Sequence, residues 1–224
     1  MSDKIKRSSN IQNEDHARTR PVLDLNRTAA RKLFINKSRP WDALPCIAEF
    51  IRENGCELPY DEFDEINEDV WVHVSAYLSP TAKIEAPAII CGGAKINHFS
   101  TVASSVIGAF AQVGECSRVN GSILFDRSKL CGMNYFSHSI LGYGSVVGQG
   151  AQAPDTRLDG LNVSFDMPEG IYVTGRTHLG SIICDGVAIG SNCVINPGTV
   201  IDTGSKVHPL TSVSAYIYPY TTVK

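Results

Sequence analysis

The sequence has no basic stripe, no CxxC pair and no glycine-rich phosphate loop. Lys and Arg number 20 against 23 Asp and Glu, a net charge of −3, so we expect neither a nucleic-acid nor a membrane partner. The 7 cysteines are scattered, with no CxxC motif and no signal peptide, which predicts a reducing, cytoplasmic location. Without a phosphate-cradling loop, we expect no nucleotidyl transfer.

Aliphatic side chains recur at every sixth residue through the middle of the chain. After Val102 one step in every three shortens to five residues, so each turn of the chain is 17 residues long, and strict sixes resume from Ile183. Ala or Ser usually stands two residues before these positions, and Gly or Asn often follows, as tight corners require. The repeated positions include Val72, Leu78, Ile84, Ile90, Ile96, Val102, Ile107, Val113, Val119, Leu124, Leu130 and Leu141.

This period predicts an all-β fold. A six-residue strand and turn cannot bury its apolar side alone, so such units stack into a solenoid with coils about 4.8 Å apart. The sequence therefore predicts a parallel β-helix of hexapeptide repeats, preceded by a short N-terminal helical segment. The alternative, an antiparallel sandwich, would show period-two alternation and irregular turn spacing.

Four regions follow from composition. Residues 1–20 are polar and charged and are predicted to be a disordered arm, and residues 21–68 a helical segment with its linker. Residues 69–224 form the β-helix, interrupted at about 154–180, where the hexads fail in a stretch rich in Gly, Asp and Pro. A loop ejected from a solenoid is usually functional, so we place the site on this side.

Two amphipathic helices are expected within the helical segment. The first starts near Leu23, has Leu25, Ala29, Leu33 and Phe34 on one face, and is stopped by Pro40. The second runs from near Asp42 through Ile47, Phe50 and Ile51 to Asn54-Gly55, a common C-terminal signal. The acidic stretch at 61–69 is expected to link it to the first coil.

The coils resemble a known family. They are similar to the acetyltransferase half of bacterial UDP-N-acetylglucosamine pyrophosphorylase/glucosamine-1-phosphate acetyltransferase, and more so to its stand-alone sugar nucleotidyltransferase-like homologues. The resemblance covers roughly residues 22–224 and implies a left-handed β-helix and a homotrimer with sites between prisms. It is carried by VWVHVSAYLSPTAKIEAPAII (70–90), NGSILFDRSKL (120–130), NYF (134–136), SILGYGSVVGQGA (139–151) and NCVINPGTVIDTGSKVHPLTSV (192–213).

The resemblance also locates a site. The family's acetyl-transfer site uses a His, an Arg and a Lys, and these positions are Gly132, Ala103 and Asn120 here, so the usual catalytic His is lost. The family's Asp at the next corner corresponds to His138, and an Asn of its ejected loop corresponds to Asp155. The positions that match are His98, Asn134 and Tyr135, which the resemblance implies bind substrate.

A coil of 17 residues predicts which side chains are neighbours, because residues 17 apart in the sequence stack on adjacent strands. His98, Glu115, Gly132 and Gln149 form one outward ladder, and Thr101, Arg118, Tyr135 and Gln152 form its neighbour; His138 stacks beside Asp155. Each of the pairs His98/Glu115 and His138/Asp155 could hold an imidazole in one tautomer for use as a base. Neighbouring polar side chains are also what any solvated sheet face shows.

Three further residues complete the candidate site. His178 falls where the family has a basic residue that contacts substrate, although an exposed loop His is an equally simple interpretation. Gly190 and Ser191 would give the pantetheine arm of an acyl-CoA room. No metal site is expected, because a three-His zinc site of the kind found in carbonic anhydrases of similar architecture would need two His five residues apart and a third one coil away.

Two functions remain open on the sequence alone. The first is an acyl-CoA-dependent transfer to an amine or hydroxyl of a sugar-like or other small polar substrate, with His138 as the base and Asp155 as its orienting group. The alternative is a non-catalytic or repurposed trimer that binds or scaffolds, since a fold alone implies no activity.

Overall fold

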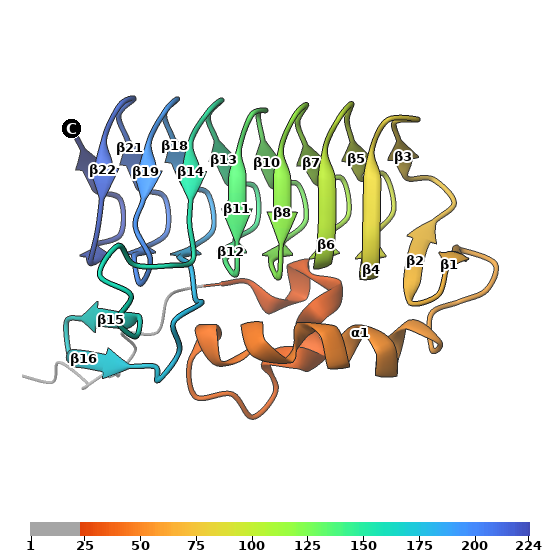
Figure 1. The fold of residues 1–224 in the computed structure, drawn as a ribbon, viewed down its shortest axis with the longest axis horizontal. Coiled ribbons are helices and arrows are strands. Elements are labelled where there is room, and N and C mark those ends of the chain that lie inside the picture. The colour runs from red at the N-terminus through yellow and green to blue at the C-terminus, as the bar shows by residue number, and fades with distance from the viewer. Residues whose placement is uncertain (1–22) are drawn as a thin grey trace, which may run out of the picture.

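The computed structural model describes residues 23–224. The predicted arm, residues 1–20, lies outside the described residues. From Val70 onward the chain winds into a triangular prism of parallel strands, seen side-on in Figure 1. The predicted fold class, a parallel β-helix with a short N-terminal helical segment, is confirmed.

The prism has three faces, and consecutive coils pair in parallel register on each. The front face holds the first halves of β4 (Lys83–Ile90) and β6 (Thr101–Ile107), then β8 (Arg118–Asn120), β11 (Tyr135–Ser137), β14 (Gln152–Ala153), β19 (Val194–Ile195) and β22 (Ser212–Val213). The covered face holds β2 (Val70–His73), the second halves of β4 and β6, β9 (Ile123–Leu124), β12 (Ile140–Leu141), β17 (Ile182–Ile183), β20 (Val200–Ile201) and β23 (Tyr216–Ile217). The back face holds β3 (Tyr77–Leu78), β5 (Lys95–Ile96), β7 (Gln112–Val113), β10 (Lys129–Leu130), β13 (Val146–Val147), β18 (Ala188–Ile189), β21 (Lys206–Val207) and β24 (Thr222–Val223).

The predicted hexad residues fill the interior of the prism. They form one apolar cluster that runs along its axis, with Leu78 and Ile84 partly buried at its N-terminal end. The small residues at the corners are explained by a ladder of buried serines. The hydroxyl of Ser122 accepts the backbone N–H of Ser139 at 3.1 Å, and that of Ser139 accepts the N–H of Ser181 at 2.9 Å.

The covered face is packed under the N-terminal segment, a contact that sequence reasoning missed. The outward residues of this face form a second apolar cluster with Leu33, Phe34, Leu44 and the apolar side of α1 (Ile47–Gly55). Figure 1 shows the helical segment lying along the prism beneath these strands. The outward residues are Ile89, Val106, Ile123, Ile140, Ile182 and Val200.

The helical segment differs from expectation in its first half. The second predicted helix is present as α1, but the first is broken into the short 3₁₀ turns η1 (Leu25–Arg27) and η2 (Ala29–Phe34). The side chain of Thr28 caps Ala30 N–H, which starts a new turn, and Ala30 is buried where Ala29 was expected. Two more 3₁₀ turns, η3 (Pro40–Asp42) and η4 (Leu44–Cys46), lead into α1.

Two further segments border the prism. The acidic linker contains β1 (Phe63–Asn67), which pairs antiparallel with β2. The ejected loop contains a hairpin of β15 (Ser164–Met167) and β16 (Gly170–Val173). Within residues 23–224, no helix is long and apolar enough to cross a membrane.

The ejected loop docks on the N-terminal segment. The rings of Trp41 and Phe165 stack at 4.0 Å between centroids, with their planes 9° apart. Arg39 forms an ion pair with Glu169 at 3.0 Å and donates to the Tyr172 hydroxyl at 2.5 Å. The hairpin therefore belongs to the same packed layer as the helices. Its position is fixed by contacts between residues that are far apart in the sequence.

Candidate active site

His138 and Asp155 meet at the corner where the front and covered faces join. His138 follows β11, and Asp155 stands one coil further, just after β14. The His138 Nδ1 lies 2.6 Å from Asp155 Oδ2. Since an ionised carboxylate only accepts hydrogen bonds, Nδ1 is the nitrogen that carries a proton, and in the neutral form of the imidazole Nε2 has the lone pair. This arrangement suits a general base.

Asp155 is nearly buried but strongly hydrogen-bonded. Burial alone would raise the pKa of its carboxyl, but hydrogen bonds from His138, Ser137 and His178 outweigh it and lower the pKa to about 2. The Ser137 hydroxyl donates to Oδ2 at 3.1 Å, and His178 Nδ1 lies 3.4 Å from the same oxygen. Asp155 is therefore ionised at neutral pH.

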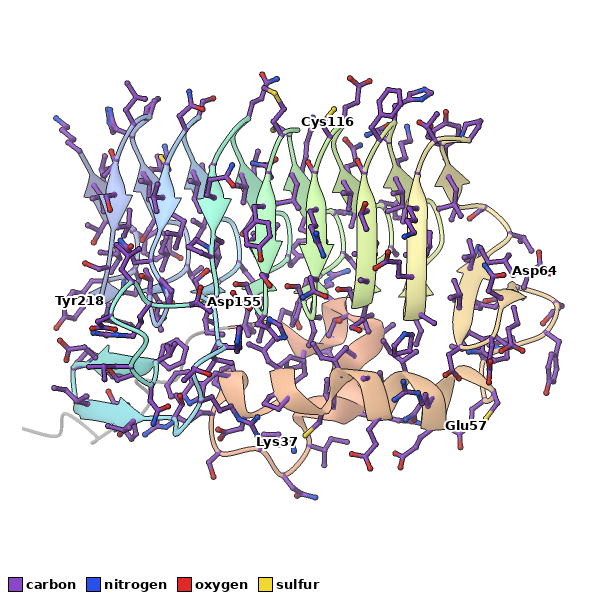
Figure 2. The ribbon with its side chains drawn as sticks, in the orientation of Figure 1. Lys37, Glu57, Asp64, Cys116, Asp155 and Tyr218 are labelled. Atoms are coloured by element: carbon purple, nitrogen blue, oxygen red, sulfur yellow. The ribbon has the colours of Figure 1, made fainter. Side chains whose placement is uncertain are left out.

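Both ends of the ejected loop close at this corner. The backbone N–H of Leu179 donates to the carbonyl oxygen of Asp155 at 2.8 Å, and that of Gly180 donates to the carbonyl oxygen of His138 at 2.8 Å. The loop thus leaves and rejoins the coil beside the imidazole, and places His178 at 6.3 Å from the His138 ring. Figure 2 shows Asp155 at the lower edge of the front strands, above the N-terminal segment.

Gly121 makes room for the imidazole, a role that sequence reasoning missed. A Cβ on Gly121 would lie 2.7 Å from both Cδ2 and Nε2 of His138. Gly121 stacks one coil before His138 and has a φ of +56°, so glycine suits both the space and the backbone. Ser137 was also missed, and its adjacency to His138 together with a 17-residue coil could have indicated its contact with Asp155.

The predicted front-face residues fall into two kinds. Arg118 and Tyr135 are adjacent on β8 and β11, with Arg118 exposed and Tyr135 half-buried. Asn134, expected to bind substrate, is buried, and its amide donates to the carbonyl oxygens of Gly148 and Ala151. The structure gives Asn134 a part in joining coils, because these hydrogen bonds connect it to the next coil.

His98 and Glu115 lie at a different corner, between the back and front faces. His98 Nδ1 contacts the hydroxyls of Ser79 at 2.8 Å and Thr81 at 3.1 Å. Across the described part of the chain, no hydrogen bond or ion pair joins His98 to Glu115. The predicted dyad of these two residues is therefore absent, because the hydroxyls of the preceding coil engage the imidazole.

A shallow pocket of about 360 Å³ lies at this second corner, with Glu115, Lys129 and Gln149 in its wall. Ser191 stacks one coil beyond Gln149 in the same column. Gly190 has a packing role, because a Cβ there would lie 2.4 Å from the backbone nitrogen of Pro209. Within the chain this corner and the His138 corner lie at opposite ends of the front strands.

Within residues 23–224, no group of three or more His, Cys, Asp or Glu side chains is arranged to bind a metal ion. Asp155 with His138 and His178 is instead a hydrogen-bonded cluster.

Comparison with known proteins gives weak likenesses. No family model matches the chain. It is 27% identical over 122 residues to a protein of Escherichia coli K12 described as a putative uncharacterized acetyltransferase, YaiX. The match covers 54% of this chain and 45% of that protein, so the chain spans about half the length of this relative.

Two solved structures have a related chain trace. A mutant of perosamine N-acetyltransferase from Caulobacter crescentus, in complex with CoA and GDP-perosamine, is 21% identical with a TM-score of 0.31, over 66% of this chain and 52% of that one. A mutant of the N-acyltransferase AntD from Bacillus cereus, in complex with dTDP and coenzyme A, is 16% identical with a TM-score of 0.38, over 66% of this chain and 71% of that one. At these scores the likeness carries no conclusion about function.

Proposed function

We propose that the chain is an acyl-CoA-dependent acyltransferase that acts on an amine or hydroxyl of a sugar-like or other small polar substrate. The observation that carries the proposal is the contact of His138 Nδ1 with Asp155 Oδ2 at 2.6 Å, which leaves Nε2 as a proton acceptor. The imidazole side chain is 30% exposed, so a substrate can reach it. The acetyltransferase description of YaiX supports the same class of reaction.

The chemistry needs one base and no covalent enzyme intermediate. His138 Nε2 accepts the proton of the acceptor amine or hydroxyl as its nitrogen or oxygen attacks the thioester carbonyl carbon. Asp155 stabilises the imidazolium that results, while backbone N–H groups stabilise the oxyanion. When the tetrahedral intermediate collapses, the C–S bond breaks, and the imidazolium returns its proton to the CoA thiolate.

A homotrimer is part of the proposal. Within one protomer the His138 corner and the Gly190–Ser191 corner lie at opposite ends of the front strands, so one site containing both needs two protomers. We place the pantetheine arm at Gly190 and Ser191 of one protomer, and the acceptor between His138 and His178 of another. Arg118 and Tyr135 would then line the wall between them.

The test is release of free CoA. The purified protein is incubated with acetyl-CoA and a panel of nucleotide-linked amino sugars and free amino sugars, and the thiol and the acylated product are measured by mass spectrometry. We expect turnover with at least one acceptor that is lost in His138→Ala. A binding or scaffold trimer, the alternative, would bind such a ligand yet release no CoA above the His138→Ala background.

A further inference from the structure

A second pocket lies between the N-terminal segment and the returning limb of the ejected loop. Its volume is about 280 Å³. Lys37, Trp41 and Cys46 line it from the N-terminal segment, and Thr174, Arg176 and Leu179 line it from the loop. Figure 2 shows Lys37 on the far side of the helical segment from the prism, away from the front face.

The pocket holds more positive than negative charge. Lys37 Nζ lies 3.3 Å from Cys46 Sγ, and within the described residues it has no carboxylate partner. The exposed guanidinium of Arg176 likewise makes no hydrogen bond or ion pair to any residue in the range 23–224. Asp42 also lines the pocket, and its Oδ2 accepts the backbone N–H of Arg39 at 3.0 Å.

Neither cation contributes to the contacts that hold the loop in place. The loop is docked by Trp41 on Phe165 and by Arg39 on Glu169 and Tyr172. Apart from the Lys37 contact with Cys46, neither side chain forms a hydrogen bond or ion pair within residues 23–224, yet Lys37 and Arg176 come from segments more than a hundred residues apart to line one pocket. Lys37 and Arg176 outnumber Asp42, the one carboxylate in the lining of this pocket, so an excess of positive charge remains there for an anion to offset.

We propose that this pocket binds a small phosphate-bearing anion, a phosphomonoester or a diphosphate. The guanidinium of Arg176 can bind two phosphate oxygens at once, and the Lys37 ammonium adds a point charge. The volume stands just below the usual range of about 300 to 1,000 Å³ for ligand pockets, so it suits a compact ligand better than a whole dinucleotide. Thr174, Trp41 and Leu179 complete the wall, and the Thr174 hydroxyl donates to the carbonyl oxygen of Val163.

Binding of an anion in this pocket would affect the His138 corner through one residue, Leu179. Leu179 lines the pocket, follows His178 in the chain, and donates its backbone N–H to the carbonyl oxygen of Asp155. An anion held by both Lys37 and Arg176 fastens the returning limb to the N-terminal segment and so restrains His178. This consequence for catalysis rests on the proposed function, whereas binding of the anion does not.

The experiment titrates inorganic pyrophosphate into the full chain by isothermal calorimetry at low ionic strength, with neither acyl donor nor acceptor present. We expect saturable binding that Lys37→Met with Arg176→Met weakens at least about tenfold, the effect of about 1.4 kcal/mol. The matched control is Lys95→Met with Lys206→Met, which removes the same charge from exposed positions of the back face. His138→Ala should bind pyrophosphate like the wild type, which separates this test from failure of the acyltransferase proposal.

Three outcomes would overturn the proposal. They are no binding at millimolar pyrophosphate, equal affinity in the pocket variant, or an equal loss in the back-face control. Should the double variant fail to fold, the single substitution Arg176→Gln replaces it, because that side chain is exposed and unpartnered within the described residues. As a second measurement, hydrogen exchange of residues 174–179 should slow when pyrophosphate binds, and an unchanged rate contradicts the fastening of the loop.

Discussion

The imidazole of His138 lies over Gly121 and holds the carboxylate of Asp155, so that three consecutive coils supply the floor, the base and the orienting group. A Cβ on Gly121 would come within 2.7 Å of His138 Nε2, the atom that would accept a proton. The stacking of coils, not any local motif, therefore fixes where the base sits. This relationship can be tested by substitutions at each of the three coils.

Substitution of His138 by Ala should remove the base. Loss of a positioned general base typically costs about 10² to 10⁴ in rate. We expect the His138→Ala rate of CoA release to fall by that factor, while the mass in sedimentation stays at the wild-type value. The melting temperature should fall modestly, because the nearly buried carboxylate of Asp155 loses its hydrogen bond to the imidazole. A variant that keeps full activity would contradict the role of His138.

Gly121→Ala should displace the imidazole without destroying the fold. The added methyl would collide with His138, and a φ of +56° adds strain of about 1 kcal/mol for any residue with a Cβ. The matched control is Gly144→Ala, since Gly144 has a φ of +64° and no neighbouring atom within 4 Å of the place that a Cβ would occupy. In urea, Gly144→Ala should lose only the stability that the backbone strain costs, and Gly121→Ala should lose more because of the added collision. Only Gly121→Ala should lose activity, and equal activities would contradict the steric role.

Stability at acid pH should depend on Asp155. Because its pKa is lowered to about 2 in the folded protein, from about 4 in an unfolded chain, the ionised carboxylate stabilises the fold. That contribution, about 2 kcal/mol, is complete above pH 4 and disappears as the pH falls toward 2. Urea unfolding between pH 2 and 5 should thus give a shallower pH dependence for Asp155→Asn than for the wild type, and parallel curves would contradict this assignment.

Phe165→Ala should free the ejected loop while leaving the coils intact. Phe165 is fully buried and stacks on Trp41, and removing a buried Phe typically costs about 3 to 5 kcal/mol. We expect faster hydrogen exchange at 156–178 and in the contacting part of the N-terminal segment. Exchange in β5, β7 and β10 on the back face is the internal control, and a uniform increase there would point to global unfolding instead.

Assembly should follow from the distribution of apolar surface. The covered face is packed under the N-terminal segment, whereas the front and back faces and their shared corner are not, so we expect another copy to contact those two faces. We expect sedimentation equilibrium at micromolar concentration to give three times the mass of the chain. A stable monomer would contradict the site shared between protomers.

The sequence by itself determined the solenoid and the pairing of His138 with Asp155. A six-residue repeat is a local signal, since each unit must stack on a copy of itself. In the middle coils, where each coil is 17 residues long, residues 17 apart in the sequence are neighbours in space. The interior position of Ile107, Leu124 and Leu141 follows directly. For the same reason Thr101, Arg118 and Tyr135 lie side by side on adjacent strands of the front face, as predicted.

A second periodic signal was present but not used. On the covered face the outward residue just before the interior position is apolar, as at Ile89, Val106 and Ile123, whereas on the back face it includes Lys95 and Lys129. Apolar outward positions on one face only predict that something covers that face. The packing of the helical segment could therefore have been inferred from the sequence.

Only the tertiary structure decided how the ejected loop and the N-terminal segment pack against each other near the His138 corner. The stack of Trp41 on Phe165, the ion pair of Arg39 with Glu169 and the return of the loop at Leu179 join segments with no shared repeat. No period relates such segments, so their contacts depend on the shapes and charges that meet once the prism has formed. The same holds for the separation of His98 from Glu115, which the hydroxyls of Ser79 and Thr81 decide by competing for one imidazole nitrogen.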